Sequence, residues 1–173
     1  DQLAISYYKS FELPVKIVRP FNTYGPRQSA RAIIPTIISQ ILNGKTEINL
    51  GSLSPTRDLT FVKDTCSGFE EIYKSETLFG EVTNIGVKTE ISIGELAKLI
   101  ANTMNIEVTI KSSAERIRPE NSEVERLFCD NTKLLKHTSW KPNYTFKQGI
   151  GEVIEWMKKP ENLNYFKSDK YNV

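Results

Sequence analysis

The chain has 173 residues, of which 39% are hydrophobic and 25% charged, and its formal net charge is +2. A chain of this length and composition can bury a core of its own, which excludes an intrinsically disordered protein. The small net charge is spread along the sequence and argues against a nucleic-acid-binding or membrane-binding protein. The first residues, DQLAISYYKSF, have neither the basic region nor the cleavage site of a signal peptide, so a cytoplasmic location is expected.

The N-terminal segment begins inside a helical pattern. Apolar residues recur at helical spacing over residues 1–12, and Pro14 ends the pattern. Residues 15–19 are typical of a short buried strand, which leads into the loop RPFNTYGPRQ. Because the chain lacks an initiating Met and opens in mid-pattern, we expect it to be a fragment of a longer protein.

The rest of the sequence alternates between strand and helix patterns. Ser92 and Glu95 form a capping-box sequence, and Thr145 and Gln148 form another. Further strands are expected at residues 48–50, 59–62, 81–85 and 107–111, and further helices at residues 32–42, from Asp64 to about 74, from Ser92 to about 104, after Asp130, and from Thr145 to about 158. Residues 112–126 are expected to form a polar loop. This alternation predicts an α/β fold.

Few side chains offer nucleophilic or metal chemistry. The single histidine, His137, lies in a polar segment and is expected to be solvated. Cys66 and Cys129 are expected to be free and buried, and no Cys/His spacing suits zinc. No Ser/His/Asp arrangement with a credible histidine is present.

Arginines and asparagines in loops are the remaining candidates. One guanidinium group can bind two phosphate oxygens through two parallel hydrogen bonds, and α/β folds bind their ligands at strand ends. Asn22 and Asn84 each fall at an expected strand end. The alternative is that these arginines are solvated or ion-paired and that the asparagines only shape turns. The arginines are Arg19, Arg27, Arg31, Arg57, Arg116 and Arg118.

The order of the motifs is more specific than any one of them. The stretches RPFNTYGPRQ, NLGSLSPTRDLTFVKD, TNIG, RIRPE, DNTKLLKHTSWKP and TFKQGIGEVIEW follow one another. In this order they resemble the C-terminal part of an extended short-chain dehydrogenase/reductase of the NAD-dependent nucleotide-sugar epimerase/dehydratase family. The resemblance implies an α/β fold made of the C-terminal portion of a Rossmann-like domain and a small substrate-binding α/β domain.

The resemblance also implies which parts are absent. The family's YxxxK pair and GxxGxxG loop would lie upstream of Asp1, so no catalytic residue is assigned and this chain alone is expected to be inactive. Residues 1–31 would be the last helix, strand and loop of a truncated NAD-binding domain. Residues 32–159 would form the nucleotide-sugar-binding region, parts of which return to the Rossmann sheet, and residues 160–173 a flexible tail.

Matching the family's motifs residue by residue assigns a set of binding positions. Pro20, Phe21 and Asn22 would meet NAD, whose main site lies outside the chain, and Asn22 would also bind the substrate diphosphate. Arg57 would bind the diphosphate. The other positions expected to contact the nucleotide sugar are Ile33, Ile48, Leu50, Asn84 and Arg118.

The chemistry implied is a 4,6-dehydration. Oxidation at C4 of the hexose would be followed by loss of water across C5 and C6 and return of hydride at C6. Ala32 stands where many glucose-nucleotide dehydratases have lysine, and RQSARAIIPT with RIRPENSEVERL resembles the legionaminic-acid-type amino-sugar 4,6-dehydratases. The substrate would then be a nucleoside-diphosphate N-acetylglucosamine.

Two other functions remain open from the sequence. One is a nucleotide-sugar 4-epimerase of the same family, and the other is a binding module without chemistry. The resemblance further implies a homodimer formed through the N-terminal helix of the full-length protein, whereas packing within one subunit is the alternative.

Overall fold

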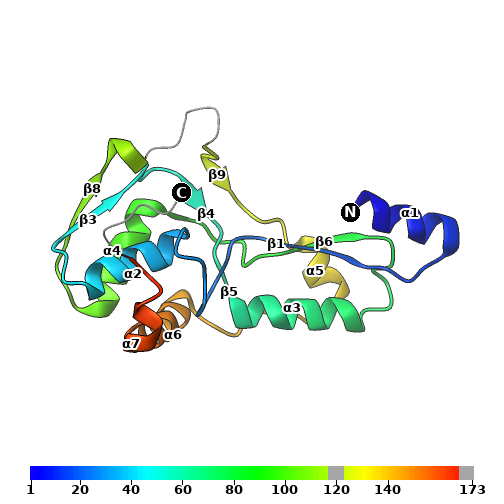
Figure 1. Cartoon of the computed structure of the whole chain (residues 1–173). Coiled ribbons are helices and arrows are strands. Elements are labelled where there is room, and N and C mark those ends of the chain that lie inside the picture. Colours follow the sequence, from blue (N-terminus) through cyan, green and yellow to red (C-terminus); the bar gives the residue numbers. More distant parts are fainter. Residues whose placement is uncertain (117–122, 168–173) are drawn as a thin grey trace. The chain divides into compact units, whose positions relative to one another are not determined.

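The computed structural model describes residues 1–116 and 123–167 (Figure 1). The chain folds into two compact units. Unit 1 comprises Asp1–Thr23, Asp58–Thr89 and Phe128–Tyr144, and unit 2 comprises Tyr24–Arg57, Glu90–Leu127 and Thr145–Val173. Each unit is therefore assembled from three separate segments, and the chain passes back and forth between the two. No described helix has the length and apolar character needed to cross a membrane.

Unit 1 is built around a pair of parallel strands. Its elements are α1 (Gln2–Phe11), β1 (Ile17–Pro20), β5 (Thr60–Phe61), α3 (Val62–Lys74), β6 (Val82–Ile85) and α5 (Thr132–His137). β1 pairs with β6 in parallel, with Ile17 opposite Val82 and Pro20 opposite Ile85. The short strand β2 (Thr23–Tyr24) lies at the boundary of the two units.

The core of unit 1 forms where α3 and α5 meet β6. The side chains of Ile72, Leu78, Ile85, Leu134 and Trp140 are at most 4% exposed and pack together. α3 approaches closely because Gly68 has no side chain: a Cβ there would come within 2.8 Å of Ile85 Cδ1. The indole N–H of Trp140 donates to the Asp64 carbonyl oxygen at 3.0 Å, which satisfies the one polar group that this ring buries.

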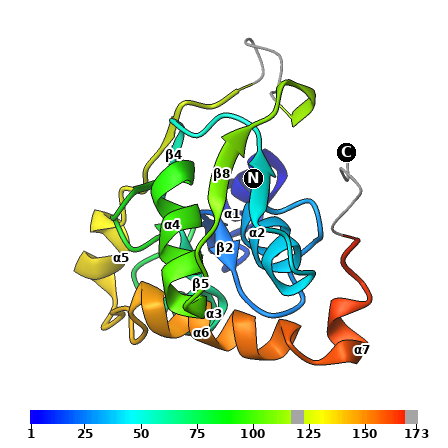
Figure 2. The same cartoon turned by 90° about the vertical axis from the view of Figure 1, so that its left-hand side faces the viewer.

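Unit 2 also contains a parallel strand pair. Its helices are α2 (Ile33–Leu42), α4 (Ile93–Met104), η1 (Ala114–Arg116), α6 (Phe146–Met157) and α7 (Pro160–Leu163), and its strands are β3 (Glu47–Leu50), β4 (Thr56–Arg57), β7 (Ile91–Ser92), β8 (Thr109–Ser112) and β9 (Arg126–Leu127). β3 pairs in parallel with β8, and Figure 2 shows α2 and α4 beside this pair. α6 packs against these two helices. β4 lies between β7 and β9 in a second, three-stranded sheet.

The α/β class expected from the sequence is confirmed, and so are both capping boxes. Ser92 Oγ accepts from the Glu95 amide at 3.2 Å, and Thr145 Oγ1 accepts from the Gln148 amide at 3.3 Å. The predicted start of α3 at Asp64 is wrong. α3 begins at Val62, and Asp64 lies in its first turn.

Residues 112–126 are not one continuous loop where they are described. β8 extends to Ser112, η1 follows, and β9 begins at Arg126, while residues 117–122 lie outside the described part. Strands β4, β7 and β9 are two residues long, and such short strands carry no period that a sequence can reveal. They form because strands distant in the chain pair with them.

Candidate functional site

The carboxyl ends of β1 and β6 lie side by side in unit 1 because the two strands are parallel. The Phe21 amide donates to the Ile85 carbonyl oxygen at 2.8 Å, continuing the ladder one residue past β1. The Thr60 amide donates to the Asn22 carbonyl oxygen at 3.0 Å. These bonds fix the backbone of the RPFN stretch, of which Pro20 is the exposed last residue of β1. Ligands in open α/β sheets bind at such strand ends.

Asn22 carries an unsatisfied donor at this edge. Its side-chain Nδ2 is buried and has no hydrogen-bond partner among the described residues. A buried amide N–H that lacks a partner is costly, so such groups in folded proteins usually meet a bound molecule or an ordered water. Asn22 is thus the predicted residue whose surroundings favour a ligand most directly.

Asn84, on β6, lies in the same unit but is already engaged. Its Nδ2 donates to the Asp130 carbonyl oxygen at 3.3 Å. Asn131, which no sequence motif indicated, also lies in unit 1. Its Nδ2 donates to the Gly86 carbonyl oxygen at 2.8 Å, and its buried Oδ1 has no partner in the described part of the chain. The motif DNTKLL gave no signal for this role, because Asn131 reaches β6 only through the folding of α5 onto the sheet.

Arg57 lies in unit 2 and is held by several acceptors. Its Nη1 donates to the Val124 carbonyl oxygen at 2.6 Å and to the Thr56 carbonyl oxygen at 2.8 Å. Its Nη2 forms an ion pair with Glu123 Oε1 at 2.8 Å, and both side chains are about 15% exposed. A diphosphate would therefore compete with Glu123 for this guanidinium.

The three apolar positions assigned to the nucleotide lie in unit 2. The side chains of Ile48 and Leu50 on β3 are 0% and 1% exposed, so they form part of the core of this unit. Ile33 is the half-buried first residue of α2. Contact of these three residues with a base stays a prediction, and the fully buried side chains leave the backbone of β3 as the group that could approach a ligand.

The predicted site residues divide between the two units. Pro20, Phe21, Asn22 and Asn84 belong to unit 1, whereas Ile33, Ile48, Leu50 and Arg57 belong to unit 2. Arg118 lies outside the described residues. The structure brings the unit 1 group together at one sheet edge.

The cysteines differ from each other in environment. Both are free, but only Cys129 is buried, so the prediction that Cys66 is buried is wrong: it lies on the exposed side of α3. Burial, and then the nearby Asp58, raise the pKa of Cys129 to about 12. Cys129 therefore stays a neutral thiol and is unsuited to act as a nucleophile.

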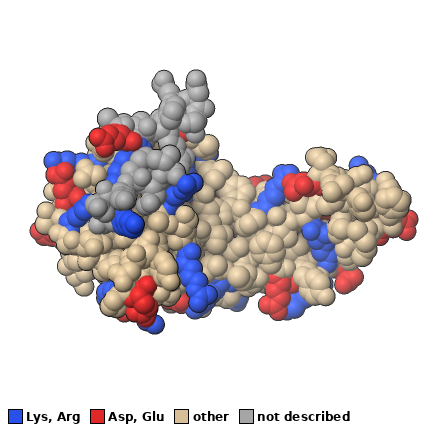
Figure 3. Space-filling model, in the orientation of Figure 1, with Lys and Arg blue, Asp and Glu red and all other residues tan. Residues whose placement is uncertain are grey.

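The described residues show neither a patch of one charge on the face in view nor a cluster suited to a metal ion. Figure 3 shows lysine and arginine interspersed with aspartate and glutamate on the face in view. No group of three or more His, Cys, Asp or Glu residues that could hold a metal ion occurs among the residues described.

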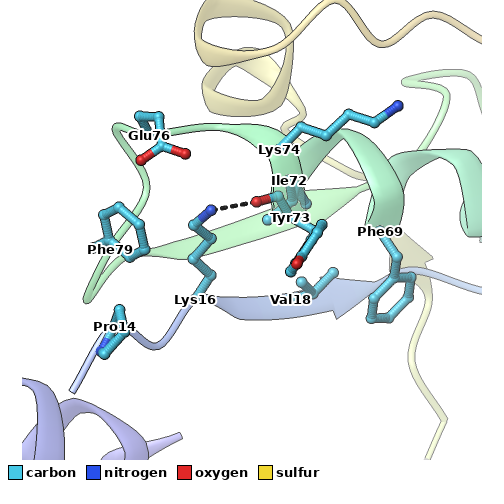
Figure 4. Close-up of a pocket in the computed structure, with 9 residues that line it drawn as sticks. All are labelled: Pro14, Lys16, Val18, Phe69, Ile72, Tyr73, Lys74, Glu76 and Phe79. Atoms are coloured by element: carbon cyan, nitrogen blue, oxygen red, sulfur yellow. Dashed lines mark hydrogen bonds between the residues drawn. The ribbon is translucent and has the colours of Figure 1, made fainter.

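An apolar cavity of about 660 Å³ opens beside β1 in unit 1. Figure 4 shows Lys16, which immediately precedes β1, and Val18 of β1 facing Phe69, Ile72 and Tyr73 of α3 across it. The Lys16 ammonium donates to the Tyr73 carbonyl oxygen at 2.6 Å and lies 4.4 Å from the centre of the Phe79 ring. None of the predicted site residues lines this cavity.

Comparison with known proteins assigns the family. The model of the GDP-mannose 4,6 dehydratase family matches residues 1–153. The UDP-N-acetyl-alpha-D-glucosaminuronate decarboxylase of Bacillus cytotoxicus is 34% identical over 155 residues, which is 87% of this chain and 48% of the relative.

Two solved structures show the same architecture. The dTDP-glucose 4,6-dehydratase of Bacillus anthracis, in complex with NAD, superposes with a TM-score of 0.77 at 31% identity, covering 93% of this chain and 50% of that one. The UDP-glucuronic acid 4-epimerase of Bacillus cereus, in complex with UDP-glucuronic acid and NAD, superposes with a TM-score of 0.81 at 25% identity, covering 91% and 49%.

The chain therefore spans about half the length of these relatives. Its match to the family model covers most of its residues, and its α/β architecture agrees with that of the solved structures. The chain belongs to the GDP-mannose 4,6-dehydratase family, among the nucleotide-sugar dehydratases and epimerases of the extended short-chain dehydrogenase/reductases.

Proposed function

We propose that this chain is the substrate-binding portion of an NAD-dependent nucleotide-sugar 4,6-dehydratase. The observation that carries the proposal is the buried, unpartnered Nδ2 of Asn22 at the carboxyl end of β1. A diphosphate oxygen accepts such a donor and removes the cost of burying it. The half-length match to dehydratases that act on nucleotide sugars supports the same conclusion.

The chain's own residues would bind and orient the substrate. Asn22 would donate to the diphosphate through its free side-chain amide. Arg57 is assigned to the diphosphate on the family pattern. Asn84 and Arg118 are assigned to the nucleotide on the family pattern alone. No residue of the chain is assigned to proton transfer, so we propose that the 173 residues alone do not turn over a nucleotide sugar.

The residues present fit only an edge of NAD. The Phe21 amide is committed to Ile85, and the Phe21 carbonyl oxygen accepts from Thr23 Oγ1 at 3.1 Å. What Pro20, Phe21 and Asn22 can still offer is a carbonyl oxygen and the Asn22 side-chain amide. When bound, NAD supplies hydride acceptance and return, and in this chain Asn22 would orient its nicotinamide end.

A 4-epimerase is the second candidate, favoured by the likeness to the UDP-glucuronic acid 4-epimerase. The substrate class that we favour is a nucleoside-diphosphate N-acetylglucosamine, since Ala32 replaces a phosphate-binding lysine of the glucose-nucleotide enzymes and a relative acts on an N-acetylglucosaminuronate nucleotide. A cytoplasmic location stays a prediction.

We further propose that the full-length protein is a homodimer that associates through α1. This helix buries none of its residues, and Leu3 and Phe11 are each 73% exposed. Large apolar side chains gathered on one helix are typical of an interface. The centres of the Tyr7 and Phe11 rings lie 5.5 Å apart, so these two side chains form a joint apolar patch on the helix.

Calorimetric titration tests the binding proposal directly. The protein that contains this chain is titrated with UDP-N-acetylglucosamine, dTDP-glucose and GDP-mannose, and Asn22→Ala is the test variant. We expect saturable binding of one of the three and about tenfold weaker binding by the variant. Absence of binding to all three, or equal affinity of the variant, would contradict the proposal.

Product analysis separates the two reactions. Proton NMR of the product formed with NAD should show a methyl group at C6 in place of the hydroxymethyl group if the protein is a dehydratase. Inversion at C4 with the 6-hydroxyl intact would identify an epimerase instead. Turnover by the purified 173-residue chain would overturn the proposal that it is inactive alone.

A further inference from the structure

Asp58 is a fully buried carboxylate that joins distant segments of unit 1. Its side chain is 0% exposed. Oδ1 accepts from the Val87 amide at 3.2 Å, and Oδ2 accepts from the amides of Lys88 and Cys129 at 3.0 Å and 3.1 Å. A buried carboxylate that accepts backbone N–H groups with both oxygens fixes the relative position of the segments that donate them.

These segments are the ones that frame the carboxyl ends of β1 and β6. Val87 and Lys88 follow β6 after Gly86, and Cys129 precedes Asp130, whose carbonyl oxygen accepts from Asn84. On the other side, Thr60 lies two residues after Asp58 and donates its amide to the Asn22 carbonyl oxygen. Asp58 therefore connects by short paths to both asparagines of this edge.

The surrounding backbone is tightly constrained. A Cβ on Gly86 would lie 2.4 Å from Cys129 Cβ and 3.3 Å from Asp58 Oδ2, so only glycine lets these segments meet. Lys88 has a φ of 58°, a left-handed conformation that non-glycine residues adopt at a cost. The bond from the Lys88 amide to Asp58 stabilises this conformation.

We propose that Asp58 is a positioning residue for the ligand-binding edge of unit 1, holding Asn22 and Asn84 where a nucleoside-diphosphate sugar binds. The inference rests on the proposed function. A carboxylate is required because both of its oxygens accept, whereas the amide of an asparagine presents N–H groups to at least one of the donating amides.

The chain offers a matched control in Asp64. This second buried carboxylate of unit 1 is 1% exposed and accepts from the amides of Asn143 and Tyr144 at 2.8 Å and 3.3 Å. It holds the segment after Trp140 on α3 and, within the described part of the chain, makes no hydrogen bond to the strand ends. Asp58→Asn and Asp64→Asn therefore remove comparable hydrogen bonds at different places in one unit.

The first experiment needs no ligand. The side-chain amide signals of Asn22 and Asn84 are assigned by NMR in the unmutated protein and in both variants. We expect Asp58→Asn to shift or broaden both signals and Asp64→Asn to leave them in place. Unchanged signals in Asp58→Asn, or equal changes in the two variants, would overturn the proposal.

If Asp58→Asn does not fold, amide hydrogen exchange of the unmutated protein tests whether Asp58 holds these segments together. The amides of Val87, Lys88 and Cys129 should be protected to the same degree, because one carboxylate holds all of them. Rapid exchange of these amides while β6 stays protected would contradict the role of Asp58.

The second experiment measures the consequence for binding. At a temperature where both variants are folded, Asp58→Asn should bind UDP-N-acetylglucosamine or dTDP-glucose at least about tenfold more weakly than Asp64→Asn. Equal affinities would overturn the positioning role. If the unmutated protein binds neither sugar, the proposed function fails, and the NMR result still decides whether Asp58 positions the two asparagines.

Discussion

Arg126 and Glu90 form a two-point ion pair in unit 2. Arg126 Nε lies 2.9 Å from Glu90 Oε2, and Arg126 Nη2 lies 2.8 Å from Glu90 Oε1. The Thr56 hydroxyl donates to the same Oε2 at 2.8 Å. Through these contacts Glu90 ties β9 to β4, two strands of only two residues each.

The first prediction concerns pH. Hydrogen bonds from Arg126 and then Thr56 lower the pKa of Glu90 from 4.5 to about 2. Because the pKa is lower in the folded state, the stability that this pair contributes is present above the unfolded value of 4.5 and is lost as the pH falls toward 2.

Glu90→Gln should therefore lose stability near neutral pH and show a flatter pH dependence below 4.5, as measured by urea unfolding. Glu155→Gln is the control, because the ion pair of Glu155 with Lys158 is exposed within one helix turn. If the free energy of unfolding fell equally steeply with pH below 4.5 in Glu90→Gln and in the unmutated protein, the prediction would be contradicted.

The second prediction tests the close approach at Gly86. Gly86→Ala places a Cβ 2.6 Å from Cys129 Sγ and should lower the free energy of unfolding by about 1–3 kcal/mol. Gly151→Ala is the matched control, since a Cβ there meets nothing within 4 Å and lies in helix α6.

This control should be more stable by about 0.5–1 kcal/mol, because alanine is the better helix former. Both values come from urea unfolding at one temperature. Equal stability of the two variants would show that the segments around Gly86 can separate at little cost.

The third prediction concerns Arg57 and its ion-pair partner. Arg57→Ala removes a charged donor and should weaken nucleotide-sugar binding about 10- to 100-fold. Glu123→Gln should instead strengthen binding several-fold, because it releases a guanidinium nitrogen that now lies 2.8 Å from Glu123 Oε1. Calorimetry measures the affinity of both variants for the nucleotide sugar. Weaker binding by Glu123→Gln would mean that the ion pair helps to orient Arg57 for its ligand.

The fourth prediction concerns the apolar surface of α1. Replacing Leu3 and Phe11 by lysine should weaken self-association of the full-length protein about tenfold or more, measured by sedimentation over a range of concentrations. Tyr165→Lys is the control, because Tyr165 is 76% exposed and lies outside α1. An unchanged dissociation constant of the dimer would show that α1 does not form the dimer interface.

The long helices, the α/β class and the order of the family motifs could all be predicted from the sequence. The capping boxes at Ser92 and Thr145 work between residues three apart in the chain, so local sequence was enough to find them. The helices predicted at residues 32–42 and from Ser92 to about 104 follow the helical period, and the structure confirms both, as Ile33–Leu42 and Ile93–Met104.

The division into two units and the hydrogen bonding at the carboxyl ends of β1 and β6 followed only from the tertiary structure. Asp58 reaches amides that lie 29 to 71 residues away in the chain, and the Asn22 amide lacks a partner only because of how β1 and its neighbours are buried. Hydrogen bonds over such separations leave no period in a sequence. For that reason the sequence could name Asn22 through a family motif, but only the fold showed its unsatisfied amide and the carboxylate that holds its surroundings in place.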